Sequence, residues 1–393
     1  MWVNVINHNG IFNQYITMSK TKNLLSISVA DSLGAGIGAI FWFILATLIL
    51  PEKFGEIHYF LGIAGLAYGI SLIGSSDVIS VYVAKKLHLQ STISLISLIS
   101  GAISAIVVVV LFTRGDVSFI LIGYIINDLA IGYLLGKKLF FSYSKYVITQ
   151  KSLTLVLGIS FYFILGPDWI IYALALSYVH FAIIILKIFI GTKVNFSILK
   201  SHLGFVSNNY VMHLLTIVRS QVDKIIIVPL IGFEIVGNYV LALQVVVVLT
   251  ILPNIIYKYT LPHDASGDDT KRIKIFTLVC AVGFSILGIT IAPILLPNIF
   301  PNFSDAGIAI QILSVSIIPS TITLLYTSKL LGMEKSKMVL ISKAIMAITI
   351  TTSILLLATT WELIGISIAF VLSTIVEAVF LVLSYHLWVK KSI

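Results

Sequence analysis

The residues of this sequence that could do chemistry are ionisable side chains inside long apolar runs. A charge near the centre of a membrane helix costs at least about 2.5 kcal/mol by insertion scales, unless it faces water or a partner. Such residues therefore mark ion pairs, wet paths or binding sites. Those of the first half are Asp31, Asp77 and Asp128, and those of the second half are Arg219, Asp223, Lys224 and Glu377, with His213 in the same run as Arg219.

The five acids are candidates for ion coupling or gating. Asp31 and Asp77 lie within about two helical turns of a lysine-bearing loop. Pairing with those lysines is therefore as good an explanation for them as a functional role. Asp128 and Glu377 lie near the middle of their runs, where water is scarce, so a functional role is favoured. Asp223 joins this group, and the coupled ion would be H⁺ or Na⁺.

The run SNNYVMHLLTIVRSQVDK is the richest in polar residues. Arg219 and Asp223 are four residues apart, so they share a helix face and are predicted to pair. Lys224 lies about 100° further round the helix and needs another partner. Asn209, His213 and Arg219 form a polar stripe that indicates a wet path. We predict that Arg219, Lys224, Asn209 and His213 bind substrate. The alternative is a static ion pair that locks two helices together.

The elements that must position these residues are membrane-spanning helices. The chain has 393 residues, 59% hydrophobic and only 10% charged, whereas soluble proteins carry about 25% charged residues. Its apolar runs are about 20 residues long, enough to cross a bilayer as helices. We predict an all-α integral membrane protein with helices at 24–50, 57–83, 91–112, 117–138, 147–165, 168–190, 203–230, 233–257, 273–296, 304–331, 337–359 and 363–389.

The loop lysines and arginines predict the orientation. With the N-terminus inside, only Lys53 and Arg114 fall on outer loops, and the remaining loop lysines and arginines fall on inner ones. Cytoplasmic loops carry such an excess of basic residues. We therefore expect a multi-pass protein of the cell membrane with both termini in the cytoplasm.

The twelve predicted helices divide into two halves of six. A short echo supports this division, because LPEKFG ends at Gly55 and IGFEIVG ends at Gly237, each just before or within a new helix. The predicted parts are a cytoplasmic N-terminal segment at 1–23, a six-helix bundle at 24–190, a cytoplasmic linker at 191–202, a second six-helix bundle at 203–389 and a cytoplasmic tail at 390–393.

Other kinds of site are not indicated by the sequence. There is no P-loop, no His-Glu-x-x-His and no paired cysteine motif, and the lone Cys280 permits no internal disulfide. We therefore expect no metal, no cofactor and no nucleic-acid partner, the net charge of +9 being explained by topology. Met18 begins a more natural N-terminus than Met1, so residues 1–17 are expected to be an extension.

The segment from Arg219 to Val245 resembles the middle of polysaccharide flippases of the Wzx type, in the multidrug/oligosaccharidyl-lipid/polysaccharide (MOP) exporter superfamily. The matching features are Asp223 with Lys224, an apolar run, and then Val236-Gly237-Asn238-Tyr239. The segment from Ala46 to Lys86 resembles the family's first loop and second helix, and FPNFSDAGIAIQILSVSIIP resembles its ninth-to-tenth helix region. The likeness covers most of the chain, with loose motifs.

The resemblance implies a transporter and not an enzyme, with two six-helix bundles around a central cavity. Such flippases move polyprenyl- or dolichyl-diphosphate-linked oligosaccharides from the inner to the outer leaflet by alternating access, with ion coupling. The implied partners are the bilayer, the lipid-linked glycan and other glycan-assembly proteins. This sequence departs from relatives in having no intramembrane Lys or Arg in its first half. The cationic lining would then fall to Arg219 and Lys224, with Lys137 or Lys138 at the rim.

Two alternatives remain beside the flippase. A cation-coupled multidrug exporter of the same superfamily would suit the three acids of the first half. A membrane-embedded glycan polymerase or acyltransferase would need a long outer loop or a catalytic His/Asp pair, and neither is evident in the sequence.

Overall fold

The computed structural model describes the backbone of residues 5–389, and side chains from residue 27 to residue 387 except 262 and 265; the predicted tail at 390–393 lies outside this range. Every regular element that it describes is a helix, which confirms the all-α prediction. The elements are α1 (Val5–Leu48), α2 (Pro51–Ser71), α3 (Ser76–Ala84), α4 (Gln90–Phe112), α5 (Gly115–Gly136), α6 (Phe140–Leu165), η1 (Pro167–Trp169), α7 (Ile170–Leu176), η2 (Val179–Phe181), α8 (Ala182–Gly191), α9 (Phe196–Lys200), α10 (Leu203–Ile231), α11 (Phe233–Leu249), α12 (Ile251–Ser266), α13 (Lys271–Thr290), α14 (Ala292–Ile299), α15 (Ala306–Ser314), α16 (Ile317–Gly332), α17 (Ser336–Leu383) and η3 (Ser384–Val389).

The described helices account for twelve crossings. Eight are long and apolar enough to span a membrane, and two bent pairs, α11 with α12 and α15 with α16, bring the number to ten. The charged helix α10 has 29 residues, about 44 Å at 1.5 Å per residue, so it is also long enough to cross. The twelfth crossing comes from α17, because its 48 residues form two legs.

A sharp turn divides α17. Glu362 has non-helical dihedral angles, φ 42° and ψ −122°. Beyond it, a Cβ atom added to Gly365 would lie 2.2 Å from the carbonyl oxygen of Leu357. Backbone approaches this close are open only to glycine. The turn therefore folds the second leg of α17 back on the first, as two separate helices at 337–359 and 363–389 require.

The second and sixth predicted helices are broken, which the prediction of continuous helices at 57–83 and 168–190 missed. α2 ends at Ser71, and α3 begins at Ser76, whose backbone N–H donates to Asp128 Oδ2 at 2.6 Å. A carboxylate at a helix N-terminus accepts from an N–H that lacks an intrahelical partner. The second break follows Leu176, where the 3-10 turn η2 separates α7 from α8.

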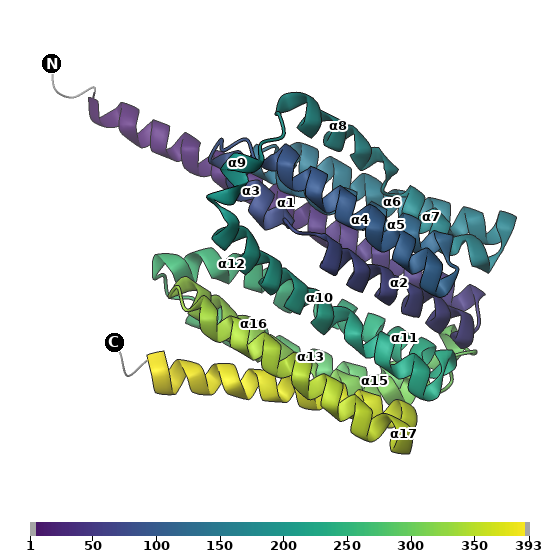
Figure 1. The fold of residues 1–393 in the computed structure, drawn as a ribbon. Coiled ribbons are helices and arrows are strands. Elements are labelled where there is room, and N and C mark those ends of the chain that lie inside the picture. The colour runs from purple at the N-terminus through teal and green to yellow at the C-terminus, as the bar shows by residue number, and fades with distance from the viewer. Residues whose placement is uncertain (1–4, 390–393) are drawn as a thin grey trace.

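The helices form two groups with α10 between them (Figure 1). The upper group in the figure contains α1 to α8, and the lower group contains α11 to α17. The helix α10 packs against both groups, through α2 on one side and α17 on the other. Both ends of the drawn chain lie on the left, which we call the lysine-rich end, where α3, α5 and α16 finish beside Lys86, Lys138 and Lys335. The opposite end, beside Lys53 and Arg114, is the lysine-poor end.

The two groups meet at the lysine-poor end through a reciprocal backbone contact between α2 and α11. A Cβ atom added to Gly55 would lie 1.9 Å from the carbonyl oxygen of Phe233, and one added to Gly237 would lie 2.0 Å from that of Pro51. These are the glycines of the LPEKFG and IGFEIVG echo. The echo therefore corresponds to two matching helix starts that pack against each other without side chains between them.

Aromatic rings extend this contact, which we call the seam (Gly55, Gly237 and the rings around them). Tyr59 packs on Phe233 with ring centroids 5.6 Å apart, and Phe54 packs on Phe303 at 5.5 Å. In both pairs one ring belongs to α2 and the other to the second group. Edge-to-face pairs at such distances add to the stabilisation from buried area. The seam therefore closes the lysine-poor end with apolar contacts.

Gly55→Ala and Gly237→Ala should each open the seam. The added methyl group would overlap a backbone carbonyl, which costs about 1–3 kcal/mol in the closed arrangement. The ratio of open to closed molecules should therefore rise by at least about fivefold. The measurement is the rate of maleimide labelling of Tyr59→Cys in a Cys280→Ser background in detergent. Gly36→Ala is the matched control, since nothing lies within 4 Å of its added Cβ. Equal labelling rates in the seam variants and the control would contradict a closed glycine seam.

Candidate substrate-binding site

The helix α10 separates two polar hollows on opposite faces. Arg219 lines one hollow, and Ile217 and Gln221 line the other. Residues two apart on an α-helix point about 200° apart, whereas residues four apart share a face. This periodicity alone explains why α10 contributes to both hollows.

The first hollow, which we call the arginine cavity, has a volume of about 370 Å³. It lies among α10, α11, α12, α16 and α17, and its polar lining consists of hydroxyls, one amide and two cations. No carboxylate is among its lining residues. They are Arg219, Leu243, Val246, Val247, Thr250, Asn254, Tyr257, Ser316, Ser320, Thr321, Thr323, Leu324, Thr327, Lys343 and Phe370.

The ion-pair partner of Arg219 is Glu377, and the prediction of an Arg219–Asp223 pair is wrong. Arg219 Nη2 lies 3.1 Å from Glu377 Oε2 on the second leg of α17, and Arg219 Nε lies 2.5 Å from the Met346 sulfur. Glu377 is only 2% exposed. Asp223 instead contacts Lys224 Nζ at 3.2 Å and accepts from the Tyr239 hydroxyl at 3.2 Å. Contacts with α11 and α17 therefore determine the partners of Arg219 and Asp223, and the four-residue spacing along α10 does not.

Lys343 is a cavity residue that the sequence reasoning missed. It was counted with the inner-loop lysines because α17 begins only seven residues earlier, at Ser336. The structure places it in the lining of the arginine cavity, near Arg219 and Glu377. No described carboxylate lies within 4.0 Å of its ammonium group. The signal available in the sequence was its position inside the predicted helix 337–359, and not in the loop before it.

The second hollow, which we call the tyrosine cavity, has a volume of about 220 Å³ between α2, α5 and α10. Its polar lining consists of tyrosine hydroxyls and side-chain amides, and it contains no cation among the described residues, whereas the arginine cavity contains two. Asp128 follows the lining residue Asn127 and hydrogen-bonds Tyr68 as well as the start of α3. The lining residues are Gly65, Tyr68, Tyr124, Asn127, Ile217 and Gln221.

Two further residues of the predicted stripe are not among the lining residues of the arginine cavity. Asn209 donates to the carbonyl of Phe205 in its own helix at 2.8 Å. The ring of His213 meets the ring of Tyr68 edge to face at 5.4 Å, and its buried Nε2 has no hydrogen-bond partner in the part of the chain described. The structure therefore brings Arg219 together with Glu377, and not with these two.

The remaining predicted acids lie elsewhere. Asp31 bridges the two groups of helices, since it pairs with Lys258 of α12 at 2.7 Å and accepts from Tyr143 at 2.5 Å. Asp77 is exposed in the first turn of α3 and makes no ion pair with a described residue. Within the described residues, no group of three His, Cys, Asp or Glu side chains could hold a metal ion.

Comparison with known proteins identifies the fold. No protein-family model and no curated protein matches the sequence. Among solved structures, the inward-facing conformation of a multidrug resistance MATE family transporter of the MOP superfamily matches 91% of this chain and 95% of its own, with a TM-score of 0.69 at 16% identity. This chain has the MOP transporter fold. The agreement confirms the twelve-helix architecture.

Two further solved structures also match this fold. The outward-facing conformation of a multidrug resistance MATE family transporter covers 91% of this chain and 93% of its own, with a TM-score of 0.59 at 16% identity. A MOP superfamily transporter from Pyrococcus furiosus, described as having a binding pocket of reverse polarity, covers 94% and 96%, with a TM-score of 0.61 at 15% identity. All three solved structures therefore agree with this chain in fold.

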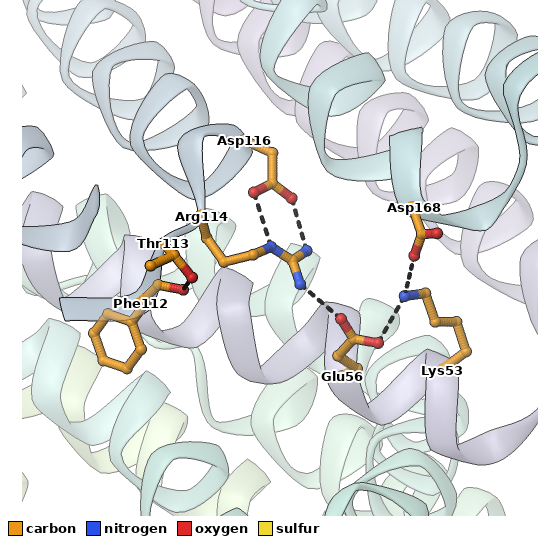
Figure 2. Close-up of polar contacts among 7 residues, drawn as sticks. All are labelled: Lys53, Glu56, Phe112, Thr113, Arg114, Asp116 and Asp168. Carbon is orange, nitrogen blue, oxygen red and sulfur yellow. Dashed lines mark hydrogen bonds and ion pairs between the residues drawn. The ribbon is translucent and has the colours of Figure 1, made fainter. Parts of the chain in front are cut away.

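A chain of ion pairs links three helix ends of the MOP fold at the lysine-poor end (Figure 2). Arg114 forms a bidentate contact with Asp116 at 2.8 and 3.0 Å and also reaches Glu56 at 2.7 Å. Lys53 continues the chain from Glu56 at 2.6 Å to Asp168 at 2.5 Å. Hydrogen bonds to the Asp116 carboxylate raise the pKa of the Arg114 guanidinium. The only two cations predicted on outer loops thus hold α2, α5 and η1 together.

A double-mutant cycle should show which acid is coupled to Arg219. Arg219→Gln and Glu377→Gln should have a coupling energy of about 0.5–3 kcal/mol, the range for contacting charged residues. Arg219→Gln and Asp223→Asn should add within about 0.5 kcal/mol. The measurement is the unfolding free energy of the detergent-purified single and double variants. A larger coupling energy with Asp223 than with Glu377 would contradict the pairing described here.

Proposed function

We propose that this protein is a flippase that moves a polyprenyl- or dolichyl-diphosphate-linked oligosaccharide between leaflets by alternating access. The observation that supports this proposal is the arginine cavity, which combines two cations with a hydroxyl lining. Arginine keeps its charge in a dry setting and offers a fork of donors that matches phosphate oxygens. Hydroxyl and amide groups such as those of Ser320, Thr327 and Asn254 can exchange hydrogen bonds with sugar hydroxyls.

The charge of the arginine cavity favours an anionic substrate. Glu377 neutralises Arg219, and Lys343 then leaves one positive charge in excess among these three residues. The hydroxyl of Thr323 is buried without a partner in the described structure. A buried polar group without a hydrogen bond is costly, so a ligand that supplies the bond is stabilised. Lys224, Asn209 and His213 remain proposed substrate contacts at other points of the passage.

The proposed direction of transport follows from the orientation. We place the lysine-rich end in the cytoplasm, in accordance with the distribution of basic residues along loops. The seam closes the lysine-poor end. Substrate would then enter from the cytoplasmic side, and opening of the seam would release it outside.

The Arg219–Glu377 pair provides a step that links loading to movement. Glu377 holds Arg219 at 3.1 Å. A substrate phosphate competes for the guanidinium, which frees the carboxylate on the second leg of α17. A proton or sodium ion could then neutralise Glu377, and Asp128, Asp223, Asp31 and Asp77 are the other proposed coupling or gating acids. Losing its ionic contact with α10 would release α17 for the change to the outward-open state.

A cation-coupled multidrug exporter is the second candidate. The tyrosine cavity favours it, because Tyr68 and Tyr124 present aromatic rings beside the Asp128 carboxylate. Aromatic faces and a carboxylate are the groups that bind organic cations. Transport of a cationic dye with no transport of a diphosphate-linked saccharide would favour this function.

The flippase proposal predicts that the position of the positive charge matters. In proteoliposomes with a fluorescent polyprenyl-diphosphate saccharide, Arg219→Gln should slow flipping by about 10–100-fold, the effect of losing a charged hydrogen bond of about 1.5–3 kcal/mol. Arg219→Lys should lose less, since it keeps the charge without the fork. The charge swap Arg219→Glu with Glu377→Arg should restore folding but not flipping.

The controls separate a substrate contact from a static lock. Lys335→Gln removes an exposed cation outside the arginine cavity, and it should flip at the wild-type rate. A fully active swap variant would show that Arg219 and Glu377 only lock two helices, and it would overturn the substrate-contact proposal.

A further inference from the structure

A separate pocket at the lysine-rich end lies outside both cavities of α10. It has a volume of about 490 Å³ and is formed by the α12–α13 connection, α16 and the final helical turns near Tyr385. Its lining contains the apolar residues Ile275, Leu278 and Leu325 as well as lysines, tyrosines and aspartates. Along α13 and α16 the lysines Lys271 and Lys329 lie nearer the lysine-rich end than these apolar residues. This order resembles the boundary between the headgroups and acyl chains of a membrane leaflet.

Three aspartates line the rim, and two of them have side-chain partners that can carry a positive charge. Asp264 accepts from Lys274 Nζ at 2.5 and 2.6 Å, from Ser328 at 2.5 Å and from Thr270 at 2.6 Å. Burial would raise the pKa of Asp264, but these hydrogen bonds outweigh it and hold the pKa below its ordinary value. Asp268 pairs with His263 at 2.8 Å. Asp264 and Lys274 therefore form a neutral unit within the rim.

Two lysines of the rim keep donors for a ligand. Lys329 lies between two aromatic rings, 5.0 Å from the centroid of Tyr326 and 4.9 Å from that of Tyr385. Lys271 is exposed, and its backbone N–H, not its ammonium, bonds Asp269 at 2.9 Å. Neither ammonium has a carboxylate within 4.0 Å among the described residues. Basic pockets between helices at a membrane surface bind anionic headgroups.

We propose that this pocket binds the phosphate of an anionic phospholipid from the leaflet at the lysine-rich end. Lys271 and Lys329 contact the phosphate, the hydroxyls of Tyr326 and Tyr385 lie beside the glycerol, and Ile275 and its apolar neighbours contact the first part of the acyl chains. A phosphatidylglycerol headgroup has the required charge and fits the volume. This inference does not depend on the substrate of the arginine cavity.

Native mass spectrometry of the full chain from nanodiscs tests the proposal. Wild-type protein should retain one phosphatidylglycerol and should not retain phosphatidylcholine in its place. Lys271→Gln with Lys329→Gln should weaken retention about thirtyfold. Each lysine near an anionic surface strengthens binding about fivefold, and this variant removes two of them. Lys193→Gln with Lys200→Gln is the matched control, since it removes two exposed lysines near the same end.

A single variant and a soluble competitor complete the test. Lys271→Gln alone alters only an exposed side chain, so it should fold, and it should weaken retention about fivefold. Equal loss in the Lys193/Lys200 control would indicate general attraction to the surface and would overturn the pocket. Unchanged retention in both lysine variants would overturn it too. Displacement of the lipid by millimolar glycerol phosphate would show a soluble phosphate site instead of a lipid site.

Discussion

The close approach of two helix starts, at Gly55 and Gly237, is the constraint on which the arrangement of the molecule depends. Each glycine lies against a carbonyl of the opposite helix at a distance that admits no Cβ atom. The contact is reciprocal, so both groups of helices contribute the same element to it. Because α2 and α11 meet without side chains between them, the lysine-poor end is closed, and α10 diverges from that point with a polar hollow on each side.

The charges in the membrane follow the same division. In the first group of helices, Asp128 accepts hydrogen bonds from the Ser76 backbone and from Tyr68. On the other side of α10, the cation Arg219 pairs with a carboxylate of α17. Replacing one partner of a buried ion pair leaves a costly unpaired charge, whereas exchanging the partner for a ligand does not. The Arg219–Glu377 pair is therefore suited to a binding site as well as to a structural contact.

Much of the architecture could be predicted from the sequence because hydropathy and loop charge act locally. Long apolar runs must be helical in lipid, and their number and order follow directly. The same reasoning identified Arg219 and Glu377 as intramembrane charges. It failed where tertiary contacts compete with local ones. The spacing along α10 predicted an Arg219–Asp223 pair, but Tyr239 and Lys224 bind Asp223 instead.

Other features leave little trace in a single sequence. The break before Ser76 falls at Gly74-Ser75-Ser76-Asp77, a short polar stretch inside a long apolar run, and the contact with Asp128 of another helix could not be read from it. Lys343 looked like a loop lysine because it lies close to the start of its helix. The glycine echo was visible, but its meaning depends on two helices 182 residues apart in sequence meeting in space.

Side-specific labelling of the arginine cavity tests most directly the claim that the seam leaves it open from one side only. Asn254 lines this cavity and is exposed, so Asn254→Cys in a Cys280→Ser background is the probe. In membrane vesicles, an impermeant maleimide should label it when the cytoplasmic face is outside and leave it unlabelled when the opposite face is outside. Equal labelling from both faces, or labelling from the opposite face alone, would contradict the account.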